Sequence, residues 1–207
     1  MRIAGVDEVG RGPLAGPVVA AAVVFEEGYY QPEIRDSKQL SPKKREELSE
    51  LIKKEALQWA IVAVGHRRIQ AINILQAARL AMRLAVERVS ADMVLVDGNT
   101  RIEIAQPQQT IIGGDALRIE ISAASIIAKV WRDELMCVFD RRYPGYGFSD
   151  HAGYGTRAHR KALSRLGPCP IHRRTFHGVC EFFPSLCSPK ADAEEGSEDT
   201  AMGTESL

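Results

Sequence analysis

Short apolar runs that end in an acidic residue recur along the chain. Apolar runs followed by turn residues are typical of buried strands. Three of them are residues 2–6 before Asp7-Glu8, residues 93–96 before Asp97, and residues 111–112, which lead through two glycines to Asp115. Residues 16–25 and 60–64 indicate two more strands, and the first of these forms a hairpin with residues 2–6 through residues 10–17.

Between the runs lie segments with helical periodicity. Ser41-Pro42 is a helix start signal, because Ser serves as N-cap and Pro fits the first helical position, and this helix runs to about residue 57. Polar positions recur every three or four residues over 68–89, which predicts a helix packed along a sheet. Residues 122–139 and 156–166 predict two further helices. Alternating strands and helices indicate an α/β fold.

The composition changes after residue 142, where glycine and proline become frequent. We therefore divide the chain into a core over residues 1–142, a C-terminal segment of helix and loop over residues 143–183, and a tail over residues 184–207. The tail has few large apolar side chains and many Ser, Ala, Glu and Asp residues, so we expect it to be disordered.

Charge is unevenly distributed although the chain is neutral overall, with 27 basic and 27 acidic residues among 207. The tail holds six of the acids and one Lys, which leaves residues 1–183 with 26 basic and 21 acidic residues, a net charge of about +5. Ten basic residues and four acids lie within residues 129–177, interleaved with tyrosines and histidines. This pattern predicts a surface that follows nucleic-acid phosphates, and Lys38 extends it.

Membrane insertion and secretion are not expected. The longest apolar run, residues 18–25, is far shorter than a membrane span, and Asp7 and Glu8 interrupt the region that a signal peptide would need. The four cysteines form no CxxC pair and are too sparse for a disulfide scaffold. We expect reduced thiols in a cytoplasmic protein.

Four carboxylates form the candidate site: Asp7, Glu8, Asp97 and Asp115. Ligand sites in α/β sheets form where strands end, and a buried carboxylate is costly unless it is paired or binds a metal. Asp7 and Glu8 are adjacent and would point to opposite faces of a regular strand, so sharing one site requires a strand break, which Gly10, Gly12 and Pro13 supply. An all-oxygen ligand set selects Mg²⁺ or Mn²⁺, and two such ions suit phosphodiester hydrolysis. A Ca²⁺ site or a phosphatase would use the same ligands.

The sequence resembles the ribonuclease HII family (type 2 ribonuclease H) in ordered blocks over residues 3–183. The matching blocks are Asp7-Glu8-Val9-Gly10-Arg11-Gly12-Pro13, Asp36-Ser37-Lys38-Gln39-Leu40-Ser41, Val96-Asp97-Gly98, Gly114-Asp115, residues 122–133, Tyr143-Pro144-x-Tyr146-Gly147, His151-x-Gly153-Tyr154-Gly155-Thr156 and Pro170-Ile171-His172-Arg173. Chance agreement over so many blocks is negligible.

The resemblance implies a ribonuclease H-like fold, with a five-stranded mixed sheet flanked by helices and a C-terminal helical segment. It makes Asp7, Glu8, Asp97 and Asp115 catalytic metal ligands. It assigns Gly10-Arg11-Gly12 to the 2′-hydroxyl at an RNA-to-DNA junction and Tyr154 to stacking on the following sugar. Lys38, which extends the basic surface, is a further substrate-binding candidate. Glycine in such a turn also lets backbone N–H groups approach a sugar closely.

The implied activity is that of an endonuclease acting on RNA–DNA hybrids and on ribonucleotides embedded in duplex DNA. The implied mechanism uses two Mg²⁺ or Mn²⁺ ions and leaves 5′-phosphate and 3′-hydroxyl ends, and we expect a monomer. Two departures from the family pattern are Val9 for the usual Ala and Ala152 for the usual Lys, the second of which removes a phosphate contact. Alternative functions are an idle nucleic-acid-binding protein or a DNA-junction nuclease of the same fold.

Two further residues have competing interpretations. Asp133 is more consistent with an ion pair to Arg132 or to a helix neighbour than with metal binding. His172 either orders the C-terminal segment against the sheet or contacts substrate, and the sequence does not decide between these roles.

Overall fold

A five-stranded mixed sheet forms the centre of the molecule. The computed structural model describes residues 1–34 and 40–186, and the predicted substrate residue Lys38 lies outside them. The strands are β1 (Ile3–Val9), β2 (Val18–Val24), β3 (Gln58–Val64), β4 (Met93–Asp97) and β5 (Gln108–Ile111), in the order β3-β2-β1-β4-β5. β1 pairs antiparallel with β2 and parallel with β4, so the predicted hairpin and mixed sheet are confirmed.

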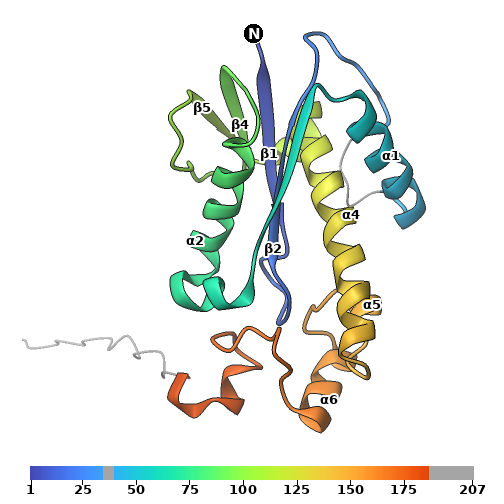
Figure 1. Cartoon of the computed structure of the whole chain (residues 1–207), viewed down its shortest axis with the longest axis vertical. Coiled ribbons are helices and arrows are strands. Elements are labelled where there is room, and N and C mark those ends of the chain that lie inside the picture. The colour runs from blue at the N-terminus through green and yellow to red at the C-terminus, as the bar shows by residue number, and fades with distance from the viewer. Residues whose placement is uncertain (35–39, 187–207) are drawn as a thin grey trace, which may run out of the picture.

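Helices cover both faces of the sheet, as Figure 1 shows. The α-helices of the described residues are α1 (Pro42–Glu55), α2 (His66–Val86), α3 (Gly114–Leu117), α4 (Ile119–Arg142), α5 (Phe148–His151) and α6 (Arg157–Leu166). α2 packs on one face, and α1 and α4 pack on the other. All seven residues of β2 are buried, because alternate side chains face α2 and α4.

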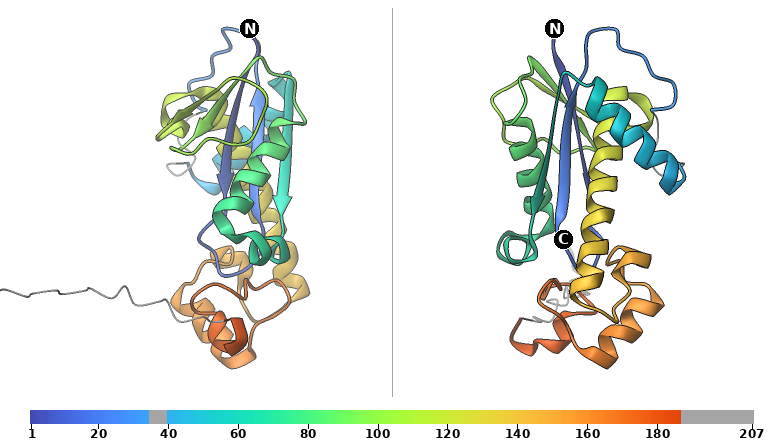
Figure 2. Two further views of the ribbon diagram at one scale, coloured as in Figure 1. Left: turned by 90° about the vertical axis from the view of Figure 1, so that its left-hand side faces the viewer. Right: turned by 45° about the vertical axis from the view of Figure 1, so that its right-hand side comes forward.

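Close packing of α4 on β1 depends on a missing side chain. A Cβ atom on Gly5 would lie 2.2 Å from the carbonyl carbon of Glu120, where α4 begins. Glycine at this position lets the helix backbone lie directly against the strand. α4 then continues past the end of the sheet into the C-terminal segment (Figure 2).

The helix predicted over residues 68–89 is interrupted, which the sequence pattern did not indicate. Asn73 has a φ of 63° inside α2, and its side-chain oxygen accepts a hydrogen bond from the Gln76 N–H at 3.1 Å. Asn73 therefore caps the second part of the helix. The last strand also differs from its prediction: β5 spans residues 108–111, is only partly buried, and leaves Ile112 outside it.

The C-terminal segment contributes Tyr146, Phe148, Leu163 and Val179 to an apolar cluster that it shares with Leu14 and Met136 of the preceding part of the chain. It lies at the end of the sheet where the connection between β1 and β2 also lies (Figure 2). Two short 3-10 helices, Cys180–Phe182 and Pro184–Leu186, follow α6. The second lies within the predicted disordered tail, whose remaining residues, 187–207, are outside the described part of the chain.

No helix within residues 1–34 and 40–186 is long and apolar enough to cross a membrane. Cys137, Cys169 and Cys180 form no disulfide within the described residues.

Candidate active site

Adjacent parallel strands bring three of the four predicted carboxylates together. Asp7 and Glu8 lie near the end of β1, and Asp97 is the last residue of β4. The last pair between these strands is Val6 and Val96, so Asp97 lies beside Asp7 at the next position. Parallel pairing thus places carboxylates that are 90 residues apart at one edge of the sheet.

The strand breaks at Gly10, one of the predicted break residues, but this break does not turn Asp7 and Glu8 to one face. β1 continues to Val9 and pairs Asp7 with Ala21 and Glu8 with Ala20. The two acids consequently point to opposite faces of β1, and each still lies near enough to Asp97 for the charge of Asp97 to raise its pKa. Asp7 receives a hydrogen bond from Ser125 of α4. Glu8 lines a small groove of about 100 Å³ with Arg79 and other residues of α2 and with Asp97.

Asp115 approaches the same edge from the short helix α3. The backbone N–H of Gly114 donates to Oδ1 of Asp97 at 2.8 Å, which ties the start of α3 to the end of β4. Ser122 donates its hydroxyl to the Asp115 carbonyl at 2.6 Å, and the Asp115 side chain is buried. All four predicted carboxylates therefore lie around the ends of β1 and β4.

Burial and mutual repulsion raise the pKa values of three of these carboxylates. Burial raises the pKa of Asp7 well above its ordinary value, and the charges of Glu8 and Asp97 raise it further. Burial also raises the pKa of Glu8, an effect that Arg11 opposes and Asp97 reinforces. Burial raises the pKa of Asp97, and the negative charge of Asp115 raises it further. Such a cluster is stabilised by bound cations.

The described residues do not form a closed metal cage. No three side chains of His, Cys, Asp or Glu among them are already arranged to hold one ion. The carboxylates surround the end of the sheet from β1, β4 and α3, and their donor atoms are all oxygens, a set that fits Mg²⁺ or Mn²⁺.

The loop after β1 is held by two buried arginines. Arg173 donates to the carbonyls of Gly10 at 2.6 Å, Arg11 at 2.8 Å and Gly16 at 2.9 Å. Arg132 donates to those of Pro17 at 3.0 Å, Ala152 at 3.0 Å and Ala15 at 3.3 Å. Gly10 has a φ of 90°, and a Cβ there would lie 2.3 Å from Nε of Arg132. Only glycine fits where the guanidinium crosses the loop.

These two arginines correct the predicted phosphate-binding surface. Arg132 and Arg173 were counted among its ten basic residues, but both side chains are fully buried. They hold backbone carbonyls instead of facing a polyanion. Burial, together with the charge of Arg132, lowers the pKa of Arg173 to about 9. Nothing in the spacing of the sequence distinguished these arginines from the exposed ones.

Tyr154 lies beside the Gly10-Arg11-Gly12 loop. A Cβ on Gly12 would lie 3.6 Å from Cε1 of Tyr154, and the Leu14 N–H donates to the Gly153 carbonyl at 2.8 Å. The Tyr154 side chain is 41% exposed, which excludes the role of a core tyrosine. The loop and the tyrosine therefore form one continuous surface near the carboxylates, and Arg11 connects them through an ion pair with Glu8 at 3.3 Å.

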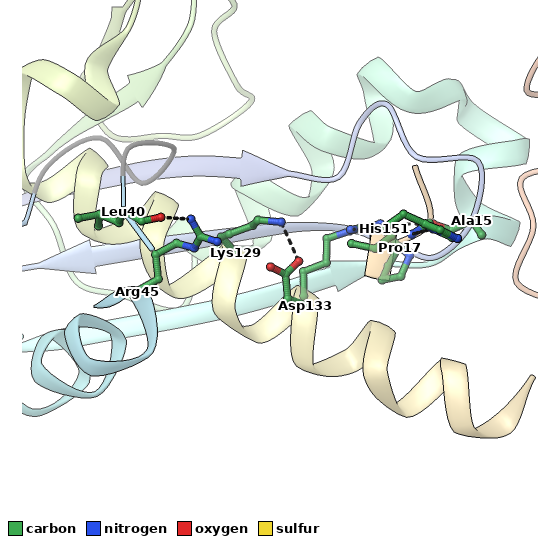
Figure 3. A network of polar contacts seen from close by, with 10 residues as sticks. Ala15, Pro17, Leu40, Arg45, Lys129, Asp133 and His151 are labelled. Carbon is green, nitrogen blue, oxygen red and sulfur yellow. Dashed lines mark hydrogen bonds and ion pairs between the residues drawn. The ribbon is translucent and has the colours of Figure 1, made fainter. Parts of the chain in front are cut away.

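The other residues singled out in the sequence mostly contact other parts of the chain and not the carboxylate cluster. Asp133 pairs with Lys129 one helical turn away at 2.8 Å, which confirms the helix-neighbour alternative (Figure 3). His172 is buried and contacts His159. Val9 packs against the core on the α4 face. Ala152 has a φ of 47°, and its carbonyl accepts from Arg132; the phosphate contact that its identity removes stays a prediction.

Known proteins of one family are similar to this chain over most of its length. A family model described as ribonuclease HII matches residues 4–179. The chain is 51% identical over 183 residues to the ribonuclease HII of Syntrophotalea carbinolica, covering 87% of this chain and 88% of that protein. The chain belongs to the ribonuclease HII family. It is therefore a ribonuclease H, a nuclease that hydrolyses phosphodiester bonds.

Solved structures show the fold shared by this ribonuclease HII chain. The crystal structure of ribonuclease H2 from Pyrococcus horikoshii OT3 superposes with a TM-score of 0.75 at 26% identity, covering 90% of this chain and 99% of that one. Bst-RNase HIII in complex with Mn²⁺ gives a TM-score of 0.64 at 16% identity, covering 90% of this chain and 70% of that one. The ribonuclease H-like fold is confirmed.

Proposed function

We propose that this ribonuclease HII cuts the RNA strand of RNA–DNA hybrids and also cuts at single ribonucleotides embedded in duplex DNA, leaving 5′-phosphate and 3′-hydroxyl ends. The observation that carries the proposal is one continuous surface: the carboxylates at the ends of β1 and β4 lie next to the Gly10-Arg11-Gly12 loop, and this loop lies next to Tyr154.

Asp7, Glu8, Asp97 and Asp115 would hold the catalytic ions. Their mutual repulsion and all-oxygen chemistry favour two hard divalent cations, Mg²⁺ or Mn²⁺. When bound, such a pair activates a water for in-line attack and stabilises the leaving 3′-oxygen. Arg11 lies beside Glu8 and keeps positive charge on the substrate side of the cluster.

The loop presents backbone donors to the ribose. A trans peptide points its C=O and the following N–H in opposite directions. Because the carbonyls of Gly10 and Arg11 point inward to Arg173, the N–H groups of Arg11 and Gly12 point the other way. Two adjacent outward N–H groups can donate to a 2′-hydroxyl, a group that distinguishes RNA from DNA.

Tyr154 would read the nucleotide after the ribose. Its exposed ring can stack on a deoxyribose, where a second 2′-hydroxyl would crowd it. The loop then reads the RNA side of the junction, and the ring reads the DNA side.

A cleavage assay tests the proposal. Labelled duplexes that are all DNA, DNA with one ribonucleotide, or RNA–DNA hybrid, together with a branched DNA junction, are incubated with Mg²⁺, Mn²⁺ or chelator, and the cut is mapped. We expect cutting of the two ribose-containing substrates only, in metal only. Binding without cutting would indicate an idle binding protein, cutting of branched DNA a junction nuclease, and either result would overturn the proposal.

A further inference from the structure

A buried histidine pair lies beneath Tyr154 in the C-terminal segment. The side chains of His159, on α6, and His172 are both fully buried, and their Nε2 atoms are 3.1 Å apart. His151 stacks on His159 with ring centroids 4.5 Å apart. Phe148 packs edge-on against His159, and Tyr146 packs against His172. The carboxylate site uses none of these histidines.

Hydrogen-bond partners fix the proton on each ring. Nδ1 of His172 lies 2.9 Å from the Cys169 backbone nitrogen, 3.1 Å from Cys169 Sγ and 3.3 Å from the Cys169 carbonyl oxygen; the shortest contact is with the N–H, so Nδ1 accepts and the proton of a neutral ring is assigned to Nε2. That Nε2–H donates to Nε2 of His159, which leaves the His159 proton on Nδ1. Nδ1 of His159 lies 2.9 Å from the carbonyl oxygen of Tyr154 and donates to it. The chain of bonds therefore runs in one direction, from Cys169 to Tyr154.

Both rings are neutral in this arrangement. Burial lowers the pKa of His159, and burial together with the neighbouring His159 lowers the pKa of His172 to about 4. A proton added to His159 would place N–H groups on both facing Nε2 atoms. The directional chain exists only in the neutral pair.

The backbone of Tyr154 is held at both ends by this cluster. Its N–H donates to the His151 carbonyl at 2.8 Å, and its carbonyl accepts from His159 and from the Thr156 N–H at 2.8 Å. The Thr156 hydroxyl caps α6 by accepting from the His159 N–H. These hydrogen bonds thus join the first turn of α6 to the loop that carries Tyr154.

We propose that His159 and His172 are positioning residues for Tyr154, setting the place of its exposed ring against Gly12 through the donated hydrogen bond to its carbonyl. The inference rests on the proposed function, because it matters only if Tyr154 contacts substrate. The pair touches no reacting group itself.

Two variants of His159 isolate the bond to Tyr154. His159→Asn places an amide N–H near the former Nδ1, whereas His159→Leu has similar bulk and no donor. Both variants lose the hydrogen bond to His172. The difference between them therefore reports the hydrogen bond that is donated to the Tyr154 carbonyl. We expect His159→Leu to lower kcat/KM on a single-ribonucleotide duplex about tenfold and His159→Asn to stay within about threefold of the wild type. Equal losses in both variants would contradict the proposal.

A double-variant cycle separates this inference from the proposed function. In a Tyr154→Ala background, His159→Leu should change kcat/KM by less than about twofold, because the ring that it positions is gone. If Tyr154→Ala alone has no effect, the proposed substrate contact fails, and this inference fails with it. If Tyr154→Ala reduces cleavage, two results make only the positioning role fail. In one, His159→Leu lowers kcat/KM by the same factor with and without Tyr154; in the other, it has no effect in the wild-type background.

A measurement on the unaltered protein covers the case in which a buried variant does not fold. Imidazole ¹⁵N correlation spectra report which ring nitrogen carries the proton. We expect the Nδ1–H form for His159 and the Nε2–H form for His172 at neutral pH. An Nε2–H form of His159 would leave the Tyr154 carbonyl without this donor and would overturn the proposal.

Discussion

Arg173 and Gly10 are joined by a hydrogen bond of 2.6 Å from the guanidinium to the carbonyl oxygen, although 163 positions separate them in the sequence. The same guanidinium holds two more carbonyls of the loop, at Arg11 and Gly16. The loop that we propose reads the ribose is therefore shaped by a residue from the far end of the chain.

Replacing this guanidinium should damage both stability and cleavage. Arg173→Lys keeps a positive charge, but its single nitrogen cannot reach three carbonyls that three different guanidinium nitrogens bind, so buried acceptors lose their donors. We expect the free energy of unfolding to fall by about 3 kcal/mol and cleavage of single-ribonucleotide duplexes to fall more than tenfold. Denaturant titration and initial rates measure the two effects.

The neighbouring Arg174 is the control, because its exposed side chain lies over the ring of Phe183. Arg174→Lys should leave the stability within about 0.5 kcal/mol of the wild type. If Arg173→Lys behaves in the same way, the guanidinium does not shape the loop.

Removing one carboxylate charge should stop the reaction. Asp97→Asn keeps the side-chain volume but takes away a charge that we propose holds a divalent ion, so cleavage in Mg²⁺ should be abolished while the fold and duplex binding remain. Asp133→Asn, which alters an acid paired with Lys129 outside the cluster, should leave cleavage unchanged. Near wild-type cleavage by Asp97→Asn would refute the two-metal assignment.

The ring of Tyr154 should matter for junction cutting. Stacking on a nucleotide contributes roughly 1–3 kcal/mol, so Tyr154→Ala should slow cleavage of single-ribonucleotide duplexes by about one to two orders of magnitude. Tyr154→Phe keeps the ring and should cost much less. Tyr30→Ala removes another exposed tyrosine and serves as the control. Equal losses on the single-ribonucleotide duplex and the long hybrid, with a lower melting temperature, would contradict junction reading.

Acid should destabilise the protein through His172. In the unfolded chain this ring takes up a proton near pH 6.5, whereas in the folded protein its pKa is about 4. The unfolded state therefore binds more protons between these values, so stability is complete above pH 6.5 and falls as the pH drops toward 4. The loss from this residue is at most about 3 kcal/mol.

Urea titrations from pH 7 to pH 4.5 measure this slope. The titratable groups that face the ring are His159, Cys169, Tyr146 and the more distant His66. Asp7, Glu8 and Asp97, whose pKa values are raised, act in the opposite direction in both proteins, so a His172→Gln variant should lose less stability on acidification than the wild type. An unchanged slope in His172→Gln would show that other groups cause the acid sensitivity.

The main features of the fold could be predicted because they depend on local pattern. Apolar runs ending at Asp7 and Asp97 marked strand ends, and strand ends in α/β sheets meet at one edge. The interruption at Asn73 could not be predicted, because the surrounding positions keep their helical period. The continuation of β1 through Asp7 and Glu8 was missed because the apolar run ends at Val6, although the break at Gly10 is present.

The parts of the site that depend on long-range contacts could not be predicted from the sequence. Arg132 and Arg173 have the same local signature as the exposed arginines around them, and only the folded chain shows that backbone carbonyls surround them. The partner of His172 was equally hidden, since His159 is 13 positions away on another element. The assignment of Lys38 lies outside the described residues and stays a prediction.

α4 contacts both ends of the proposed substrate surface. Ser125 of this helix bonds to Asp7 in the carboxylate cluster, and Arg132 of the same helix bonds to the carbonyls at the base of the loop. Seven helical residues correspond to about 10 Å. The distance between the proposed point of cutting and the proposed point of reading is therefore set by the hydrogen-bonded backbone of one helix. We expect the position of the scission relative to the junction not to depend on a hinge between two bodies.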